Sequence, residues 1–564
     1  FEGVIIVKKL LVILLCLVVV TSVFAGCTIK VIEISNENTT GKKEPVVSAE
    51  NKTSSYLNTK TEFPIVNKQL TLRFMGAKNP LQGPWEEMDV YKAMEELTNI
   101  KIQFDMVDDS AWAEKKKLVF ASGNLPDAFI RADITIEEEA TFGVQGLIMP
   151  LADLIKNHAP HLEETMKEFP NIRNSSTALD GNMYTVPYVV RSLAMAENLM
   201  YINTTWLDKL GLKMPENTDD FYNVLKKFKE SNFSKNGEVV PLITRGMSVI
   251  NTTLLGAFGD SGGGRWNVID NKVLFTPMTE AYKAYITYVK KLYSEKLIDQ
   301  NIFSHSLEQA IIKVIQERVG VICESVCTPG NLPVTNEDLY TIIPPLTSSM
   351  NSKKLTFNIG SGGLQVLTGQ FAITSTNKYP EATIRWLDLL WRKPQDEVNG
   401  LSGLSMWIGQ RGVHWDYANN EKNRYKLIAK GNKETDPQMY ILQKVTFGAT
   451  GGPARVIFDM VMEGGTALNR KHDYQTLKAI ESAKSYFPYM AQGFPPLVRF
   501  TDREREKIQA VETNIMTYVS QMEVKFITGV ESLNNWDQFI STLKMMGIEE
   551  MIAMRQVAYV NYFK

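Results

Sequence analysis

Cysteine and histidine are scarce in this chain of 564 residues, which holds four cysteines and five histidines. Cys16 and Cys27 lie in or beside an apolar N-terminal segment, so the rest of the chain keeps only Cys323 and Cys327. With a spacing of four residues and no histidine nearby, this pair is a weak zinc candidate. It forms either a small-loop disulfide or two buried thiols, and we favour thiols because closing a short loop stabilises a fold little.

An excess of charge of one sign is also missing. Lys and Arg number 61 and Asp and Glu 63, for a net charge of −2. Nucleic-acid-binding proteins usually carry a basic surplus, so we expect no nucleic-acid partner.

Signatures of catalysis are few. The sequence has no Gly-x-Ser-x-Gly elbow and no P-loop. A glycosidase needs a pair of carboxylates, and Asp108-Asp109 and Glu137-Glu138-Glu139 offer acids, but adjacent acids are typical of a solvated helix face. Pro160 between His158 and His161 argues against a helical pair of metal ligands. We therefore expect no catalytic residue, no cofactor and no metal.

The N-terminal segment has the layout of a secretory signal. Lys8 and Lys9 precede an apolar run, Leu10–Val20, which is shorter than the ~20 residues of a membrane-spanning helix. The run leads to Phe24-Ala25-Gly26-Cys27, which resembles the lipobox of bacterial lipoproteins. The resemblance implies that residues 1–26 are removed, that Cys27 is acylated, and that the remainder is anchored at the outer face of the cell membrane.

The next segments divide into a tether and a folded body. Residues 27–65 are rich in Asn, Thr, Ser, Lys and Glu and predict a flexible tether. Thereafter strand-like alternation in Gln69–Phe74 and Lys101–Met106 is separated by the helical pattern of Met88–Thr98. A helix at Trp112–Ala121 and a strand ending at Ile130 follow. This order predicts βαβ units with a largely parallel sheet.

Helical patterns dominate later in the chain. Pro215–Asn232 predicts an amphipathic helix with Thr218 as its N-cap. Thr501 and Glu504 match a capping box, and Gly547 separates two further helices. The C-terminal third is therefore expected to be mainly helical.

Several segments, in order from about residue 69 to the C-terminus, resemble the family-1 extracellular solute-binding proteins. They are ASGNLPDAFI at 121–130, GNMYTVPY at 181–188, YINTTWLDKLGLKMP at 201–215, the Pro-Glu-Ala helix at 378–388 and FITGVESLNNWDQF from residue 526. The nearest subgroup is the large Gram-positive lipoproteins that deliver sugars to ABC importers. The resemblance implies an α/β fold of the type II periplasmic-binding-protein kind, with two α/β lobes, a hinge, a ligand cleft and no catalysis.

The resemblance also implies lobe boundaries. We expect an N-terminal lobe made of residues 66–187 and 366–415, and a C-terminal lobe made of residues 188–365 and 416–564, with the helical part at its end.

Sugars are bound by flat aromatic faces and by polar side chains that hydrogen-bond hydroxyl groups. Of the nine tryptophans, Trp206, Trp386, Trp391 and Trp536 lie on apolar helix faces and are expected in the core. The other five lie in polar, glycine-rich or helix-start settings, where each is either a ligand contact or a half-buried surface aromatic. Asp127 is expected at a strand end, as a ligand contact or a helix cap, and Tyr188 and Arg191 near the first lobe crossing. The predicted ligand-binding residues are Trp85, Trp112, Asp127, Tyr188, Arg191, Trp266, Trp407, Arg411 and Trp415.

Some relatives carry a calcium-binding loop after the helix that corresponds to Pro215–Asn232. Here the loop is SNFSKNGEVVP, residues 231–241, in which Lys235 stands among the expected oxygen ligands and Glu238 is the only carboxylate. A hard cation requires several oxygens and negative charge, so we expect calcium binding at this loop to be weak or absent.

Taken together, these patterns predict a monomeric, lipid-anchored substrate-binding component of an ABC importer. Its partners would be a carbohydrate and the permease subunits, and it would act by closure of two lobes around the ligand. The alternatives are a carbohydrate-active enzyme such as a glycosidase, or a surface sensor or scaffold lipoprotein. The identity of the sugar, its chain length and a peptide ligand stay open.

Overall fold

The computed structural model describes residues 56–192, 199–234, 236–244, 246–260, 265–304, 306–323, 339–356, 364–428, 437–447, 452–458, 460–462, 486–490, 493–495 and 497–563, all within one unit, residues 55–564. The signal segment with Cys27, as well as Cys327 and the glycines 262–264, lies outside the described residues. Cys323 is buried as a free thiol.

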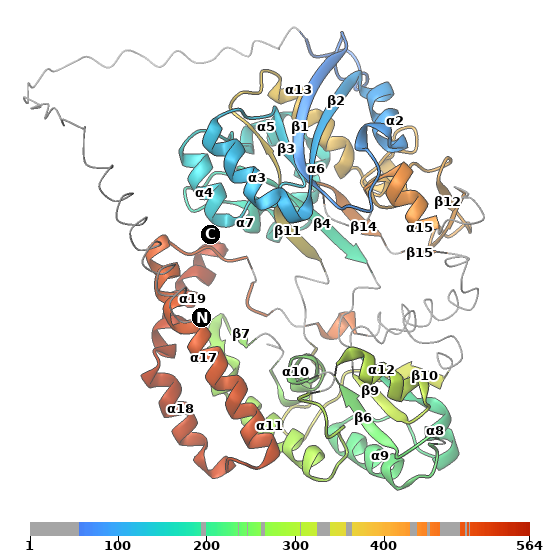
Figure 1. Cartoon of the computed structure of the whole chain (residues 1–564), viewed down its shortest axis with the longest axis vertical. Coiled ribbons are helices and arrows are strands. Elements are labelled where there is room, and N and C mark those ends of the chain that lie inside the picture. Colours follow the sequence, from blue (N-terminus) through green and yellow to red (C-terminus); the bar gives the residue numbers. More distant parts are fainter. Residues whose placement is uncertain are drawn as a thin grey trace, which may run out of the picture. The chain divides into compact units, whose positions relative to one another are not determined.

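The alternating strands predicted near the start of the body are confirmed as neighbours in a six-stranded sheet of order β14-β4-β11-β3-β1-β2. Strands β1, β2 and β3 are parallel, β14 is parallel to β4, and β11 runs antiparallel to both β3 and β4. Figure 1 shows β1 and β2 side by side in this sheet. The strands are β1 (Leu70–Lys78), β2 (Ile100–Asp108), β3 (Ala128–Ile130), β4 (Val186–Ser192), β11 (Gln365–Ile373) and β14 (Arg455–Phe458).

Period-two alternation divides this sheet between two cores. On β1, Leu72 and Phe74 join the larger core, whereas Met75 and Ala77 join the smaller core on the opposite face. Helices cover both faces, which is the arrangement that parallel strands require. They are α2 (Asp89–Thr98), α5 (Ala152–His158), α6 (Pro160–Glu168), α7 (Pro170–Ser176) and α13 (Pro380–Asp388) on the larger core, and α3 (Asp109–Ser122) and α4 (Ile136–Val144) on the smaller one.

A second, four-stranded sheet has the order β10-β5-β9-β6. Met200 and Ile202 of β5 face one core, and Tyr201 faces another. The strands are β5 (Met200–Asn203), β6 (Val240–Thr244), β9 (Val319–Cys323) and β10 (Tyr340–Ile342). The helices are α8 (Thr204–Leu210), α9 (Thr218–Glu230), α10 (Met247–Leu254), α11 (Glu280–Ser294) and α12 (Leu307–Ile315). We call the six-stranded sheet with its helices the first lobe, and the four-stranded sheet with its helices the second lobe.

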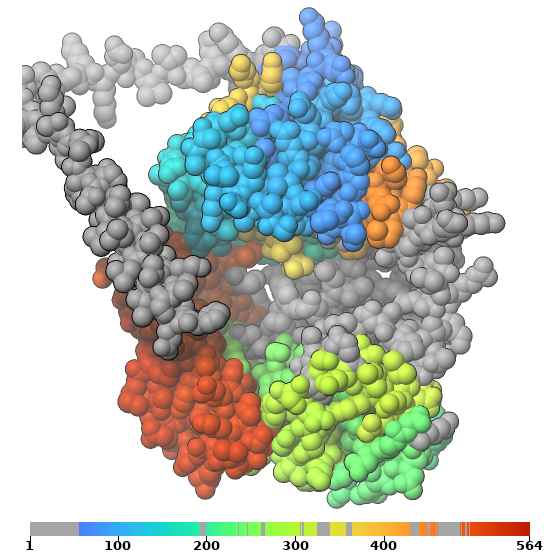
Figure 2. Space-filling view, viewed as in Figure 1, coloured from blue at the N-terminus to red at the C-terminus, as the bar shows by residue number. Residues whose placement is uncertain are grey.

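Three C-terminal helices complete the second lobe: α17 (Asp502–Thr528), α18 (Trp536–Met545) and α19 (Ile548–Tyr562). The predicted capping box is present, because Thr501 accepts from the amide of Glu504 and Glu504 accepts from the amide of Thr501. Gly547, with φ at 94°, separates α18 from α19. Figure 2 shows these helices in red at the surface of the molecule.

Shorter elements lie between these parts. They are the hairpin β7 (Trp266–Ile269) and β8 (Lys272–Phe275), the small sheet of β12 (Trp415–Tyr417), β13 (Arg424–Leu427) and β15 (Val461–Met462), the helices α14 (Ser405–Ile408) and α15 (Pro437–Tyr440), the π-helix η9 (Ile441–Val445), and the 3-10 turns η1 (Trp85–Glu87), η3 (Leu255–Phe258), η4 (Thr276–Met278), η7 (Leu389–Trp391), η8 (Pro394–Asp396), η10 (Phe487–Tyr489) and η11 (Leu533–Asn535). In the described part of the chain, no helix is both long and apolar enough to cross a membrane.

The buried cores group several segments differently from the expected boundaries, including the end of the tether and the region after residue 415. Leu57, Ile65 and Val66 pack into the first lobe, so the described end of the expected tether is part of the folded body. Beyond the expected boundary at residue 415, the first-lobe core also includes Tyr425, Ile441, Val445, Phe447, Ala454, Val456 and Ile457. Both segments carry apolar side chains that lower the free energy by burial in this core. The lobe boundaries themselves stay a prediction.

The His161–Asp388 pair makes the stability of the first lobe depend on pH. Asp388 accepts hydrogen bonds from the amides of His161 and Leu162 at the start of α6, and its Oδ2 lies 2.7 Å from His161 Nδ1. The hydrogen bond to Asp388 raises the pKa of His161 above 6.5. The pair therefore contributes fully below pH ~6.5, and the contribution is lost as pH rises through the raised pKa. His158 works in the opposite sense, because burial lowers its pKa.

We expect His161→Asn to lower the unfolding free energy most at pH 6 or below, with a smaller loss at pH 8.5. Urea unfolding across this range, measured on the variant and on the wild type, checks the expectation. His158→Asn is the matched control, and its difference from the wild type should change with pH in the opposite direction. A penalty for His161→Asn that grows with pH would contradict the role of the pair.

Candidate ligand-binding site

The carboxyl edge of β1 and β3 is the first candidate region. From β1 the chain crosses to β2 on one side, and it then returns to β3 on the other side of β1. The connections leave in opposite directions at this point, and such a switch point forms a crevice where ligands of α/β proteins gather. Sequence reasoning missed the residues that follow β3 here, Arg131 and Asp133.

Both residues adopt the left-handed backbone conformation, with φ at 49° and 46°. This conformation is uncommon outside glycine and is kept where the surroundings hold it. Arg131 is buried, and its Nη1 lies 3.0 Å from Asp109 Oδ1. Asp133 is exposed, and its Oδ1 accepts a hydrogen bond of 2.7 Å from Gln370. The exposed carboxylate is thus presented at the sheet edge by a tightly held loop.

Side chains below the loop bind its carbonyl groups. The Trp112 indole donates to Ala132 O at 2.6 Å, and Lys116 Nζ donates to Asp133 O at 2.5 Å. Gly369, with φ at 73°, lets β11 approach, because a Cβ there would lie 1.9 Å from Ile134 O. A carboxylate held in this way is a good acceptor for ligand hydroxyl groups, since little freedom is lost on binding.

Three tryptophans predicted to contact ligand lie in the core instead. Trp85 is 1% exposed and stacks on Tyr91 and Phe447, with ring centres 5.6 and 5.0 Å apart. Trp112 and Trp415 are 3% and 1% exposed, and Trp415 donates to Gly409 O. Burial of each ring among apolar neighbours is more favourable than its exposure to water, although the residues next to it in the sequence are polar. None of the three rings therefore offers a face to a ligand in this conformation.

Asp127 requires a correction of position. It directly precedes β3, at the amino end of the strand rather than at the carboxyl end where ligands gather. Its Oδ2 accepts a hydrogen bond of 2.8 Å from the amide of Arg73 and so joins β3 to β1. The carboxylate satisfies a backbone donor between two strands, and Asp133 holds the edge position that Asp127 was expected to take.

Tyr188 and Arg191 lie on β4, a strand of the first-lobe sheet, although the expected boundary assigned residues from 188 onward to the other lobe. Tyr188 is 3% exposed, burial raises the pKa of its hydroxyl well above the usual value, and no described residue hydrogen-bonds that hydroxyl. The Arg191 guanidinium carbon lies 5.8 Å from the ring centre of Phe169. Because Arg455 of β14 pairs with Val189, Arg191 and Arg455 share one face of the sheet.

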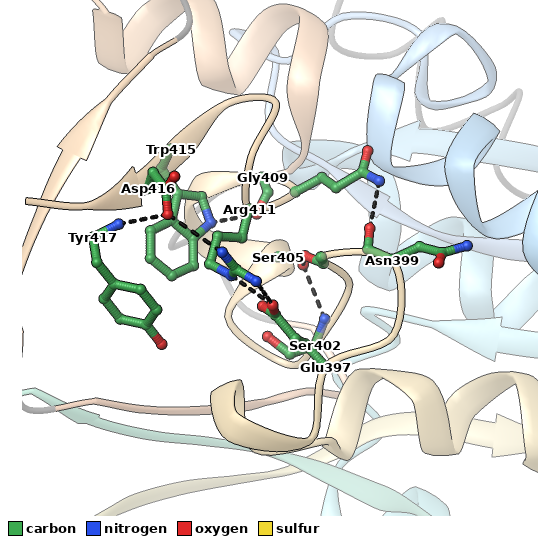
Figure 3. Close-up of polar contacts among 11 residues, drawn as sticks. Glu397, Asn399, Ser402, Ser405, Gly409, Arg411, Trp415, Asp416 and Tyr417 are labelled. Carbon is green, nitrogen blue, oxygen red and sulfur yellow. Dashed lines mark hydrogen bonds and ion pairs between the residues drawn. The ribbon is translucent and has the colours of Figure 1, made fainter. Parts of the chain in front are cut away.

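Arg411 belongs to a loop region of the first lobe in which several polar groups contact one another (Figure 3), and Trp407 lies in the same stretch of the chain. Arg411 pairs with Glu397 through Nε at 2.5 Å and with Asp416 at 3.4 Å, and hydrogen bonding to Glu397 raises its pKa. Figure 3 shows its guanidinium pointing toward both carboxylates. Trp407 is half-buried against the first-lobe core. Arg411 therefore stabilises the loop, and its charge is already compensated.

Trp266 is the predicted ligand residue of the second lobe. It begins β7 and is half-buried against Phe275, with ring centres 4.8 Å apart. The Arg555 guanidinium carbon lies 4.1 Å from the centre of its indole ring, well within the roughly 6 Å of a cation–π contact. Arg555 lies on α19, 289 residues later, and the sequence carries no signal that links the two.

The described residues include no cluster of three or more His, Cys, Asp or Glu side chains that could hold a metal ion. In the described part of the loop 231–241, Arg318 Nε donates to Glu238 O at 3.1 Å. One backbone oxygen of this loop therefore already accepts a hydrogen bond from a guanidinium group. Weak or absent calcium binding stays a prediction.

The comparison with protein families decides the identity of the chain. The family model "Bacterial extracellular solute-binding protein" matches residues 78–390, more than half of the sequence. The chain belongs to this family. The family named from the sequence is therefore confirmed.

Two curated relatives in this family are similar to the chain over much of its length. The fructooligosaccharide ABC transporter substrate-binding protein FusA of Streptococcus pneumoniae serotype 4 is 27% identical over 516 residues, which cover 89% of this chain and 92% of the relative. The polygalacturonan/rhamnogalacturonan-binding protein YtcQ of Bacillus subtilis is 26% identical to this chain. The matched region covers 66% of this chain and 73% of YtcQ.

Solved structures confirm the two-lobe α/β fold of periplasmic-binding-protein type for this solute-binding protein. FusA of S. pneumoniae in complex with kestose has a TM-score of 0.60 at 25% identity, covering 87% of this chain and 99% of the other. A solute-binding protein of Bifidobacterium longum infantis, described as binding HMO, has a TM-score of 0.70 at 20% identity, covering 88% and 100%.

Proposed function

We propose that this chain is the substrate-binding component of an ABC importer and binds an oligosaccharide between its lobes. The observation that carries the proposal is the similarity to FusA, which extends over 92% of that protein and includes both lobes. FusA is named for fructooligosaccharides and YtcQ for polygalacturonan and rhamnogalacturonan. Carbohydrate is the ligand class that these relatives share.

The geometry of the described residues supports a binding role. Asp133 offers an exposed acceptor at the carboxyl edge of the first lobe, and Trp266 offers a half-buried aromatic ring in the second lobe. Acceptors for hydroxyl groups and aromatic rings are the usual components of a sugar site. Ligand that contacts both lobes would favour the closed state by its greater affinity for that state.

The proposal includes the cellular setting. Acylation at Cys27 would hold the protein at the outer face of the cell membrane, where it would act as a monomer and pass ligand to the permease subunits. A glycosidase would bind the same ligands but release products, so binding and turnover are measured together.

Isothermal titration of the full chain with kestose, longer fructooligosaccharides and oligogalacturonates tests the function. We expect saturable binding of one of these series, at one site per chain, with the sugar recovered unchanged by chromatography. The appearance of new, shorter sugars would mean that the chain is an enzyme and not a binding protein. An absence of binding to every carbohydrate in a broader panel would overturn the carbohydrate assignment.

Asp133→Asn is expected to weaken binding of the sugar about ten- to a hundredfold, because hydrogen bonds to a charged group are worth about 1.5–3 kcal/mol. Asn tolerates the left-handed conformation that this position requires. The dissociation constant measures the effect. Asp153→Asn, an exposed acid in the first turn of α5, is the control and should bind as the wild type does. Equal affinities for both variants would remove Asp133 from the site.

A further inference from the structure

Trp266 and Arg555 form a stacked pair in the second lobe. The Arg555 guanidinium lies over the indole ring of Trp266 at 4.1 Å and over the ring of Phe500 at 5.6 Å. Its Nη2 donates to Glu512 Oε1 at 2.6 Å, which fixes the plane of the guanidinium. Residues from β7, α17, α19 and the segment before α17 thus meet around one arginine side chain.

Two N–H donors of this pair have no acceptor among the described residues. Trp266 Nε1 and Arg555 Nη1 are both buried and have no hydrogen-bond partner among the described residues. The Arg555 residue is 6% exposed, and burial lowers its pKa although Glu512 acts to raise it. Indole and guanidinium nitrogens can only donate, so what is missing is an acceptor. A buried donor without an acceptor is costly and is rare in folded proteins.

We propose that Trp266 and Arg555 form one subsite of the second lobe, in which their two N–H groups bind an acceptor oxygen of the bound oligosaccharide. This inference rests on the proposed function. The indole is only half-buried, so a ligand can reach part of it, and the two donors belong to side chains stacked 4.1 Å apart. A hydroxyl oxygen and a uronate carboxylate oxygen share the required chemistry, because both accept hydrogen bonds.

The subsite complements the candidate edge of the first lobe. Asp133 accepts hydrogen bonds from ligand hydroxyl groups, whereas Trp266 and Arg555 donate to ligand oxygens. A sugar hydroxyl can do both, since it carries one donor and two acceptor lone pairs. Arg555 is thus a residue that determines specificity. Sequence patterns do not reveal this role, because Arg555 recurs at the helix period of the buried face of α19 and so looks like an ordinary core position.

The test uses Trp266→Phe and Arg555→Lys in the full chain, titrated with kestose and with an oligogalacturonate. Trp266→Phe keeps an aromatic ring and removes the Nε1 donor. Arg555→Lys keeps the charge and removes the planar fork that reaches both Glu512 and the subsite. We expect binding to weaken about ten- to thirtyfold in each variant, as fits the loss of one hydrogen bond in a desolvated site.

Trp536→Phe is the matched control. Trp536 is 3% exposed in the same lobe and also has a cation near its ring, Lys283 Nζ at 5.9 Å. This variant should bind sugar within about twofold of the wild type. Melting temperatures of all three variants, measured without ligand, separate a loss of binding from a loss of folding, and Trp266→Phe tests the donor even where Arg555→Lys is unstable.

The two sugars identify the oxygen. If the wild type binds both sugars, a larger loss for oligogalacturonate than for kestose in Arg555→Lys assigns a carboxylate, and equal losses assign a hydroxyl group. If it binds one sugar only, weaker binding of that sugar in both variants supports the subsite, and the chemistry of that sugar names the oxygen. Wild-type affinity in folded Trp266→Phe and Arg555→Lys would overturn it, and the two donors would then hold water alone. Failure of the wild type to bind any carbohydrate is a different result, which removes the proposed function and the subsite with it.

Discussion

Glu523→Ala is expected to lower the unfolding free energy of the second lobe by about 3–5 kcal/mol. The Glu523 side chain is 4% exposed, and its two oxygens bind Arg265 Nη1 and Nη2 at 2.6 and 2.5 Å. Tyr282 also donates to it, and Asn251 donates at 3.4 Å. Removal of this carboxylate leaves the mostly buried Arg265 charge, whose side chain is 18% exposed, without its anion, which is the costly way to break such an ion pair.

The network also holds a strained backbone beside the candidate subsite. Arg265 has φ at 80° and directly precedes Trp266. Loss of its anchor is therefore expected to increase amide exchange in β7 as well as to lower stability. Calorimetry of the two-lobe protein, with hydrogen exchange to assign each transition, measures both effects, since a single unfolding free energy is not defined when lobes unfold separately.

Two further variants separate charge from packing. Glu550→Gln removes the exposed ion pair with Lys507 on the same group of helices and should change stability by no more than about 1 kcal/mol. The double variant Arg265→Leu, Glu523→Met removes both charges and should be more stable than Glu523→Ala alone. If Glu523→Ala were no more harmful than Glu550→Gln, the network would not stabilise this lobe.

The second large effect is expected at the junction of the two lobes. Arg499 Nη2 lies 2.6 Å from Glu139 Oε2, and the two side chains are 6% and 2% exposed. Glu139 is on α4 of the first lobe and accepts from Thr185, whereas Arg499 lies just before α17 and also donates to Ser175 O. Burial raises the pKa of Glu139, and the charge of Arg499 opposes this effect.

Glu139→Gln is expected to cost about 3 kcal/mol, because it leaves Arg499 buried beside a neutral group. The pair joins two separate cores, so we also expect the unfolding transitions of the lobes to move apart in calorimetry. Hydrogen exchange should rise in both α4 and the start of α17. These changes would show that the pair couples the lobes whose relative motion closes the proposed site.

Glu137→Gln is a control from the same helix. Glu137 also pairs with an arginine of α17, Arg505, at 2.8 Å, but its side chain is 54% exposed. Solvent screens such a pair, so the variant should retain nearly wild-type stability and coupling. Equal effects of the two variants would mean that burial of Arg499 and Glu139 does not decide the strength of the junction.

The sequence by itself determined the local structure and the family. Strand alternation predicted β1 and β2, the Thr501–Glu504 box began α17, and Gly547 ended α18. The helix predicted from residue 215 was also correct, although Asn217 rather than Thr218 caps it, with hydrogen bonds from the amides of Asp219 and Asp220. Such features depend on residues a few positions apart, and a single sequence displays them directly.

Only the tertiary structure decided which polar and aromatic residues are available to a ligand. Trp85, Trp112 and Trp415 lie in polar sequence settings yet are buried by segments distant in the chain. The pairs Glu139–Arg499 and Trp266–Arg555 span hundreds of residues, and the edge position of Asp133 depends on where β3 lies in the sheet. Burial and pairing of this kind arise from the packing of whole elements, and the local period of a sequence does not encode which elements meet.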